Sequence, residues 1–259
     1  MTDTDVLLSS QDPRGVLTLT LNRPLAFNAL NAALLDALEK ALDRAASDDT
    51  VRVLVLAAAG KAFCAGHDLK EMRAEPALGY YEDLFAQCGR VMMAIQQLPV
   101  PVIARVQGMA TAAGCQLVAQ CDLAVAAREA RFAVSGVNLG LFCSTPAVAL
   151  SRNVPRKAAF EMLVTGEFIS AEQARTQGLV NRVAADAAEL DAEVAALAQH
   201  IINKPRVAVA LGKALFYHQL ELGLQPAYED AVRTMACNMM ESSALEGVQA
   251  FIDKRPPRW

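Results

Sequence analysis

Hydrophobic and polar positions along the first two thirds of the chain follow strand and helix periods in turn. Residues 15–22 alternate apolar and polar side chains and stop at a proline, which predicts a strand followed by a break. Residues 31–48 carry leucines at helical spacing, which predicts a helix. By the same criteria we expect further strands at 51–58, 101–108, 121–127, 131–134 and 179–183. We expect helices at 80–97, 155–166 and 170–178, and a short helix that ends at 118.

The alternation of strands and helices indicates an α/β fold with mainly parallel strands, because each return to a parallel strand needs a crossover. From about residue 186 onward the pattern is helical throughout. Ser170 and Gln173 have the spacing of a capping box, and Ser243 and Glu246 repeat it in the last predicted helix.

Composition excludes several classes of function. The chain has 259 residues, a net charge of −4 and no basic stripe, so we expect no nucleic-acid partner. Its most apolar stretch, 100–127, is interrupted by polar and charged residues and is not expected to span a membrane. Neither the six scattered cysteines nor the three histidines have the spacing of a metal site or a disulfide framework. Glycine-rich dinucleotide and triphosphate motifs are absent, and the first residues resemble neither a secretory signal nor a transit peptide, so we expect a cytoplasmic protein.

Two loops carry the candidate chemistry. "CAGHDL" (64–69) and "MATAAGC" (109–115) each follow a predicted strand, contain glycine and lead toward a helix. A helix start presents unpaired N–H groups, and small residues let a ligand approach the backbone. Facing each other, two such loops would direct two N–H donors at one oxygen, an arrangement that stabilises an oxyanion or enolate. The alternative is that these small residues only form tight turns.

These loops belong to a longer series of motifs that resembles the crotonase (enoyl-CoA hydratase/isomerase) superfamily. The matching stretches include "AFCAGHDLKEM", "PVIARVQGMATAAGCQLVAQCDLAVAA", "TGEFISAEQARTQGLVNRV" and "FIDKRPP". The resemblance implies a spiral of ββα units over residues 1–185 and a C-terminal helical trimerisation region over 186–259. It also implies an acyl thioester of coenzyme A as ligand, no cofactor other than coenzyme A as part of that substrate, and a homotrimer or dimer of trimers.

The resemblance assigns roles to individual residues. The oxyanion-hole donors are the backbone N–H groups of His67 and Ala113. The coenzyme A site falls on Ala26 and on the loop of Ala65, Gly66, Asp68 and Leu69. Lys254 corresponds to the basic residue that meets a coenzyme A phosphate from a neighbouring subunit.

Both family carboxylates are replaced in this chain, one by Gln116 and the other by Gly136. Hydration of an enoyl thioester needs groups that activate water and deliver a proton, and losing such help typically costs ~10²–10⁴-fold in rate. We therefore expect weak hydratase activity, and expect glutamate at both positions to raise it, unless Gly136 needs a glycine-only backbone conformation. Cys143 is a candidate reactive side chain, but no base is adjacent to it in sequence.

Within the family, "GHDLKE", "ATAAGCQLVA" and "GVNLGLFCSTP" resemble the subgroup called enoyl-CoA hydratase domain-containing protein 3. Three functions stay open at this point. The chain is a crotonase-type enzyme acting on an acyl-CoA, a non-catalytic acyl-CoA-binding protein, or an enzyme for another enolate reaction such as decarboxylation or thioester hydrolysis.

Overall fold

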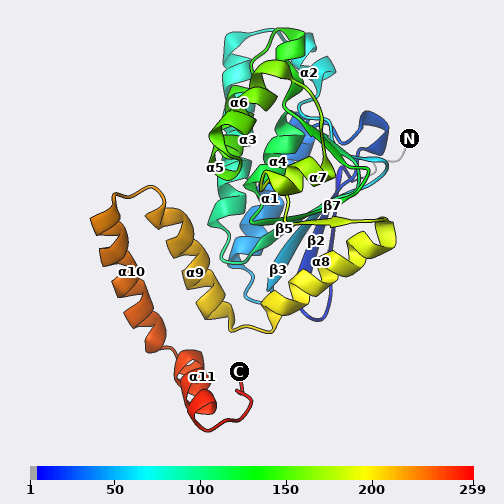
Figure 1. Ribbon diagram of the computed structural model, residues 1–259. Coiled ribbons are helices and arrows are strands. Elements are labelled where there is room, and N and C mark those ends of the chain that lie inside the picture. Colours follow the sequence, from blue (N-terminus) through cyan, green and yellow to red (C-terminus); the bar gives the residue numbers. More distant parts are fainter. Residues whose placement is uncertain (1–4) are drawn as a thin grey trace.

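The computed structural model describes residues 5–259; residues 1–4, part of the segment searched for a targeting signal, lie outside it. It consists of two sheets joined by ββα turns, followed by a helical extension (Figure 1). The strands are β1 (Leu7–Gln11), β2 (Val16–Leu21), β3 (Val53–Ala58), β4 (Ala62–Cys64), β5 (Val102–Val106), β6 (Met109–Thr111), β7 (Leu123–Ala127), β8 (Arg131–Ala133), β9 (Ile169–Ser170) and β10 (Arg182–Ala184).

Helices connect these strands and form the last quarter of the chain. They are α1 (Ala32–Ser47), α2 (Leu69–Ala74), α3 (Leu78–Gln97), α4 (Ala113–Gln120), α5 (Ser144–Asn153), α6 (Arg156–Thr165), α7 (Ala171–Thr176), α8 (Ala187–Ile202), α9 (Arg206–Gln219), α10 (Leu224–Met239) and α11 (Ser242–Ile252), with short 3₁₀ turns η1 (Pro24–Ala26) and η2 (Ser135–Leu139).

Successive turns of the chain add one strand to each sheet. The larger sheet has the order β1-β2-β3-β5-β7-β10, and all its neighbours are parallel except β1 and β2. The smaller sheet has the order β4-β6-β8-β9. Pairs β3–β4, β5–β6 and β7–β8 thus each contribute a strand to both sheets before a helix follows. This is the predicted α/β spiral of ββα units.

The larger sheet is covered on both faces, which explains its nearly continuous apolar strands. In β3, Leu54 and Leu56 belong to the main core beneath α1 and α3, whereas Val53 and Val55 face a second cluster that includes Leu190 of α8. The period of two in a strand separates these neighbouring residues into the two clusters.

Helix α8 packs on the larger sheet, and α9–α11 then lead away from it (Figure 1). A buried ion pair attaches α9 to the core. The Lys213 ammonium donates to Asp122 at 2.7 Å and to the carbonyls of Ile95 and Val100, and Tyr217 donates to the same carboxylate at 2.8 Å. The predicted division at residue 185 stays a prediction.

Helix α10 buries none of its residues, and its large apolar side chains are exposed: Leu224 (78%), Tyr228 (67%), Val232 (68%) and Met235 (72%). Such a face is typical of an interface between subunits. It agrees with the expected trimer or dimer of trimers, which stays a prediction. In the part of the chain that the structure describes, no helix is both long and apolar enough to cross a membrane.

The structure differs from the sequence predictions in short elements. The sequence pattern did not predict strands β4 and β6 or helices α2 and α5. The capping box at Ser170 and Gln173 is present. The one at Ser243 was wrong: the N-cap of α11 is Glu241, and Glu246 binds arginine instead. Three-residue strands carry too little local signal to be recognised, because pairing with distant segments creates them.

Candidate active site

The first loop lies against the segment that precedes α1. Leu30 forms a parallel bridge with His67: its N–H donates to the Gly66 carbonyl at 2.8 Å and its carbonyl accepts from the Asp68 N–H at 3.0 Å. In such a bridge the N–H of the central residue points away from the partner strand. The His67 N–H is thus directed to the opposite side and donates to no acceptor within residues 5–259.

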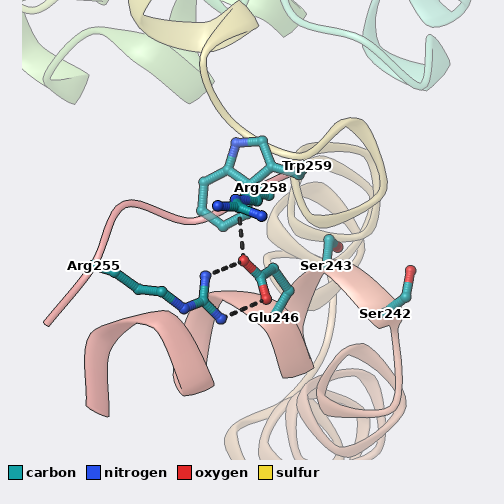
Figure 2. A pocket seen from close by; sticks show the side chains of 6 residues that line it. All are labelled: Ser242, Ser243, Glu246, Arg255, Arg258 and Trp259. Atoms are coloured by element: carbon teal, nitrogen blue, oxygen red, sulfur yellow. Dashed lines mark hydrogen bonds and ion pairs between the residues drawn. The ribbon is translucent and has the colours of Figure 1, made fainter. Parts of the chain in front are cut away.

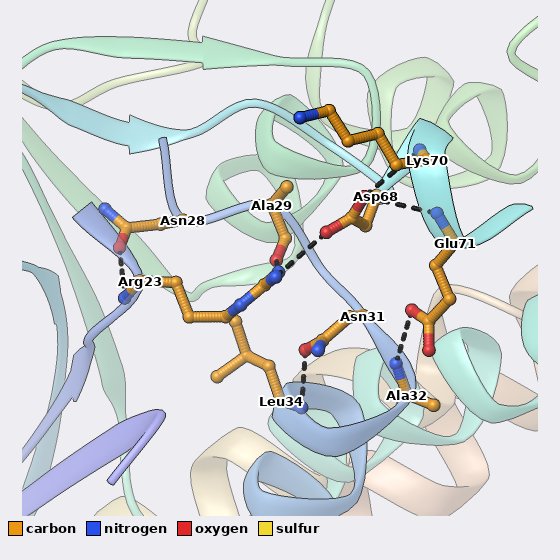
Figure 3. Close-up of polar contacts among 9 residues, drawn as sticks. All are labelled: Arg23, Asn28, Ala29, Asn31, Ala32, Leu34, Asp68, Lys70 and Glu71. Atoms are coloured by element: carbon orange, nitrogen blue, oxygen red, sulfur yellow. Dashed lines mark hydrogen bonds and ion pairs between the residues drawn. The ribbon is translucent and has the colours of Figure 1, made fainter. Parts of the chain in front are cut away.

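A polar network holds these two segments together (Figure 3). The Arg23 guanidinium donates to Asp68 at 2.9 Å and to the Ala29 carbonyl. The other oxygen of Asp68 caps α2 by accepting from the N–H groups of Lys70 and Glu71. Burial raises the pKa of Asp68, but these hydrogen bonds outweigh it and the pKa is lowered. Asp68, predicted to bind coenzyme A, therefore has its carboxylate engaged in holding the loop.

The second loop places Ala113 at the first position of α4, where a backbone N–H has no partner inside the helix. Ala112 before it has a positive φ of 51°, an uncommon conformation for a residue with a side chain, and donates to the Ala133 carbonyl at 2.9 Å. Gly66 has a φ of +90°, and a Cβ on it would lie 2.9 Å from the Ala112 Cβ and 3.3 Å from the Ala113 nitrogen. Only glycine permits this approach of the two loops.

The two loops meet at a cavity of about 320 Å³. His67, Ala113, Gly136 and Cys143, four of the predicted site residues, line it together. Ala65 and Leu69 of the predicted coenzyme A loop also line it. Most of its apolar wall was not predicted from the sequence; it comprises Met72, Phe85, Ala112, Leu139, Leu141, Phe142 and Pro146. These residues come from η2, α2, α3, α5 and adjoining loops, and no local sequence signal marks them as neighbours.

Gln116 is not among the described residues that line this cavity. It lies in α4, is only 4% exposed, and its side-chain oxygen has no hydrogen-bond partner within the described residues.

Lack of space, and not a glycine-only backbone conformation as considered from the sequence, restricts position 136 to glycine. Its φ lies outside the left-handed region, so its backbone conformation does not demand glycine. A Cβ at this position would collide with the Leu141 carbonyl oxygen and lie 2.7 Å from the Cys143 sulfur. The sulfur also accepts a hydrogen bond from the Gly136 N–H at 3.3 Å. Cys143 thus fills the space into which a side chain at position 136 would extend.

Cys143 has the environment of a packed thiol. It is 6% exposed, and burial raises its pKa although the Gly136 N–H opposes the shift. A protonated thiol is a poor nucleophile. A structural role, closing the cavity wall beside Gly136, accounts for these contacts.

Both ring nitrogens of His67 are buried, and a weak hydrogen bond with the Leu30 backbone is the one that acts on the ring within residues 5–259. Burial lowers its pKa to about 4, against an opposing effect of the Leu30 carbonyl. The imidazole is therefore neutral near pH 7, with one nitrogen able to donate and the other able to accept.

The remaining predicted binding residues lie at the edges of this arrangement. Ala26 ends η1, and the neighbouring Phe27 carbonyl accepts from the Ala65 N–H at 3.0 Å, so the two predicted coenzyme A segments adjoin. Lys254 follows α11 and has a positive φ of 54°. Its role toward a neighbouring subunit stays a prediction.

Glu246 of α11 fixes the chain end that contains Lys254 (Figure 2). Its carboxylate receives two hydrogen bonds from Arg255, at 2.6 and 3.0 Å, and one from the Arg258 N–H at 2.8 Å. The Arg255 hydrogen bonds, with that of Arg258, lower the pKa of Glu246 to about 2. Trp259 then donates to the Asn203 carbonyl at 3.3 Å, so the segment folds back toward the end of α8.

Two sheets built from ββα turns, with two glycine-containing loops that meet at one cavity, define a crotonase-type fold. A family model described as enoyl-CoA hydratase/isomerase matches residues 11–259. The chain belongs to the enoyl-CoA hydratase/isomerase family.

Individual relatives support the subgroup predicted from sequence. The mitochondrial enoyl-CoA hydratase domain-containing protein 3 of Mus musculus is 46% identical over 253 residues, which covers 98% of this chain and 84% of that protein. The crystal structure of human enoyl coenzyme A hydratase domain-containing protein 3 superimposes with a TM-score of 0.94 at 45% identity, covering 98% of this chain and all of that one. An enoyl-CoA hydratase structure from Mycobacterium smegmatis has a TM-score of 0.97 at 67% identity, covering 99% of both chains.

The comparison corrects the expected location. Five vertebrate relatives of this subgroup are named as mitochondrial proteins, which contradicts the expectation of a cytoplasmic protein. That expectation rested on the composition of the first residues, and composition there does not determine the compartment of the folded protein.

Proposed function

We propose that this protein binds an acyl thioester of coenzyme A, with the thioester oxygen between the N–H groups of His67 and Ala113. The observation that carries the proposal is the 320 Å³ cavity into whose wall both loops bring these two residues. Paired backbone donors at a helix start stabilise negative charge on a carbonyl oxygen without rearranging. The apolar wall suits the acyl chain.

The proposed coenzyme A site continues from the cavity toward the adjoining segments of Ala26 and Ala65. Lys254 of a neighbouring subunit is proposed to meet a phosphate, as the family resemblance implies. This part of the proposal is supported by the contact between Phe27 and Ala65 and by the fixed position of the chain end around Glu246.

We further propose that ordinary hydration of an enoyl thioester is slow. No Asp or Glu side chain is found among the described residues of the cavity wall. In addition, Cys143 and Leu141 occupy the space that a side chain at position 136 would need. These observations favour a second candidate function, acyl-CoA binding without turnover, and they leave decarboxylation or thioester hydrolysis as reactions that depend on enolate or oxyanion stabilisation.

Calorimetric titration with acetyl-CoA and crotonyl-CoA at low salt tests the binding proposal. We expect binding of both thioesters in the micromolar to sub-millimolar range. Absence of heat at millimolar ligand would end the acyl-CoA proposal. Loss of enoyl absorbance in crotonyl-CoA, followed with time, tests the second part, and turnover near a typical enzyme rate of ~10 s⁻¹ would contradict it.

A further inference from the structure

Strand β1 forms one edge of the larger sheet and has no strand on its outer side within residues 5–259. It pairs with β2 in antiparallel register, with Ser9 opposite Leu19, and four of its five residues are exposed. The strands at the other three sheet edges, β4, β9 and β10, have only two or three residues each. In the described part of the chain, β1 is therefore the longest open sheet edge.

The hydrogen bonds at the two ends of β1 show which of its backbone groups point outward. The Asn22 N–H donates to the Val6 carbonyl at 2.8 Å. The Asp12 N–H donates to the Val16 carbonyl at 3.1 Å. In an antiparallel pair, every second residue bonds to the neighbouring strand, and the residues between them direct their N–H and C=O groups the other way. The residues of β1 with outward groups are Leu7, Ser9 and Gln11.

Strand β1 lacks the features that usually protect an exposed edge. Natural sheets block such edges with lysine, proline or a β-bulge, because free N–H and C=O groups otherwise pair with another strand. The sequence of β1, LLSSQ, contains neither a charge nor a proline, and its register with β2 runs without a bulge. An uncharged strand also places no like charges opposite each other when it pairs with a copy of itself.

The outward groups of β1 are self-complementary. Two identical strands that pair antiparallel are related by a two-fold axis, so the same residues bond from both sides. With the axis at Ser9, each Ser9 faces the other Ser9, and each Leu7 faces the Gln11 of the second copy. All outward groups then have partners, in about six hydrogen bonds, two for each facing pair.

We propose that β1 is a contact between two copies of this chain, whose larger sheets join edge to edge by antiparallel β1–β1 pairing about Ser9. In Figure 1 the N-terminal strand, drawn in dark blue, lies on the other side of the core from α10, so this contact leaves the apolar face of α10 free for the predicted trimer. About six hydrogen bonds are fewer than the ~10 of a typical interface. In a trimer the edges of all subunits act together, and linked contacts strengthen one another. The pairing thus joins two trimers into a dimer of trimers.

Ser9→Pro tests the pairing at its centre. Proline removes an outward N–H, whereas the bonds to β2 come from the residues on either side. Ser9→Ala, which keeps the N–H, is the matched control. Light scattering at micromolar protein concentration should give a hexamer mass for the unmodified protein and for Ser9→Ala, and half that mass for Ser9→Pro. A trimer mass for the unmodified protein, or a hexamer mass that persists in Ser9→Pro, overturns the proposal.

Cross-linking tests the register without a proline variant that has to fold. Facing residues of a hydrogen-bonded pair have Cα atoms ~5.5 Å apart, within the ~4.4–6.8 Å that a disulfide spans. Ser9→Cys should therefore give a disulfide-linked pair of chains with oxidised glutathione. Ser10→Cys is the exposed control, because the two copies of that residue would be diagonal neighbours ~7–8 Å apart, beyond the reach of a disulfide. Equal cross-linking of both variants, or none in Ser9→Cys above the level of the unmodified protein with its exposed Cys237, contradicts the proposed pairing.

Discussion

The close approach of the two loops can be tested by adding one methyl group at Gly66. In Gly66→Ala the new Cβ would lie 2.9 Å from the Ala112 Cβ, 3.1 Å from the Thr111 oxygen and 3.3 Å from the Ala113 nitrogen. All three atoms belong to the backbone or are Cβ atoms, so no side chain can rotate away. The φ of +90° adds strain for any residue other than glycine.

The two effects can be given separate magnitudes. A left-handed conformation costs an alanine about 1–2 kcal/mol, and overpacking costs about 1–3 kcal/mol. Gly66→Ala should therefore lower the free energy of unfolding by about 2–5 kcal/mol. Gly140→Ala is the matched control, because Gly140 has a φ of +78° and no described atom lies within 4 Å of its Cβ position. It should lose only the strain, about 1–2 kcal/mol.

Urea denaturation at one fixed protein concentration measures both losses, and calorimetry measures the affinities for butyryl-CoA and free coenzyme A. Displacing the Ala113 N–H weakens one hydrogen bond to the thioester, so the ratio of the two affinities should fall about 2- to 13-fold in Gly66→Ala. Equal destabilisation of the two variants would refute the close approach. An unchanged affinity ratio would refute the pairing of the two N–H groups on the thioester oxygen.

Three further predictions concern protonation, steric access and assembly. Because the His67 pKa is lowered in the folded protein, only the unfolded chain binds a proton as the pH falls from 6.5 toward 4, and the free energy of unfolding decreases over that range. Urea denaturation at pH 7 and at pH 5 should therefore show a larger decrease for the unmodified protein than for His67→Phe. Gly136→Glu should destabilise the protein by about 1–3 kcal/mol, because Leu141 and Cys143 occupy the space that its side chain needs. Combined with Gln116→Glu it should therefore not restore hydration of crotonyl-CoA, contrary to the expectation from sequence. A gain of ~10² in the hydration rate in the absorbance assay would show that the loop around residue 141 moves aside. Light scattering at micromolar protein concentration should give the mass of a trimer or hexamer. The mass should decrease in Met235→Asp, because this residue is 72% exposed on the apolar face of α10. A monomer mass for the unmodified protein would contradict the predicted assembly.

Local sequence patterns accounted for the longer elements of the fold. The leucines of 31–48 predicted α1, the buried apolar run of 51–58 predicted β3, and Ser170 with Gln173 predicted the start of α7. Each of these signals lies within one element, so a single sequence contains all of it. The ordered motifs around 62–72 and 101–127 likewise identified the family, and with it the loops that carry His67 and Ala113.

Only the tertiary structure decided what surrounds those loops. Cys143 lies seven positions from Gly136, yet its sulfur fills the space beside that glycine, and this arrangement depends on how the segment between them turns. Phe85 of α3 packs against the ring of His67, a loop residue whose ring nitrogens are buried. A sequence records which residues are present, but the satisfaction of a polar group and the space for a methyl group depend on neighbours that folding brings from distant positions.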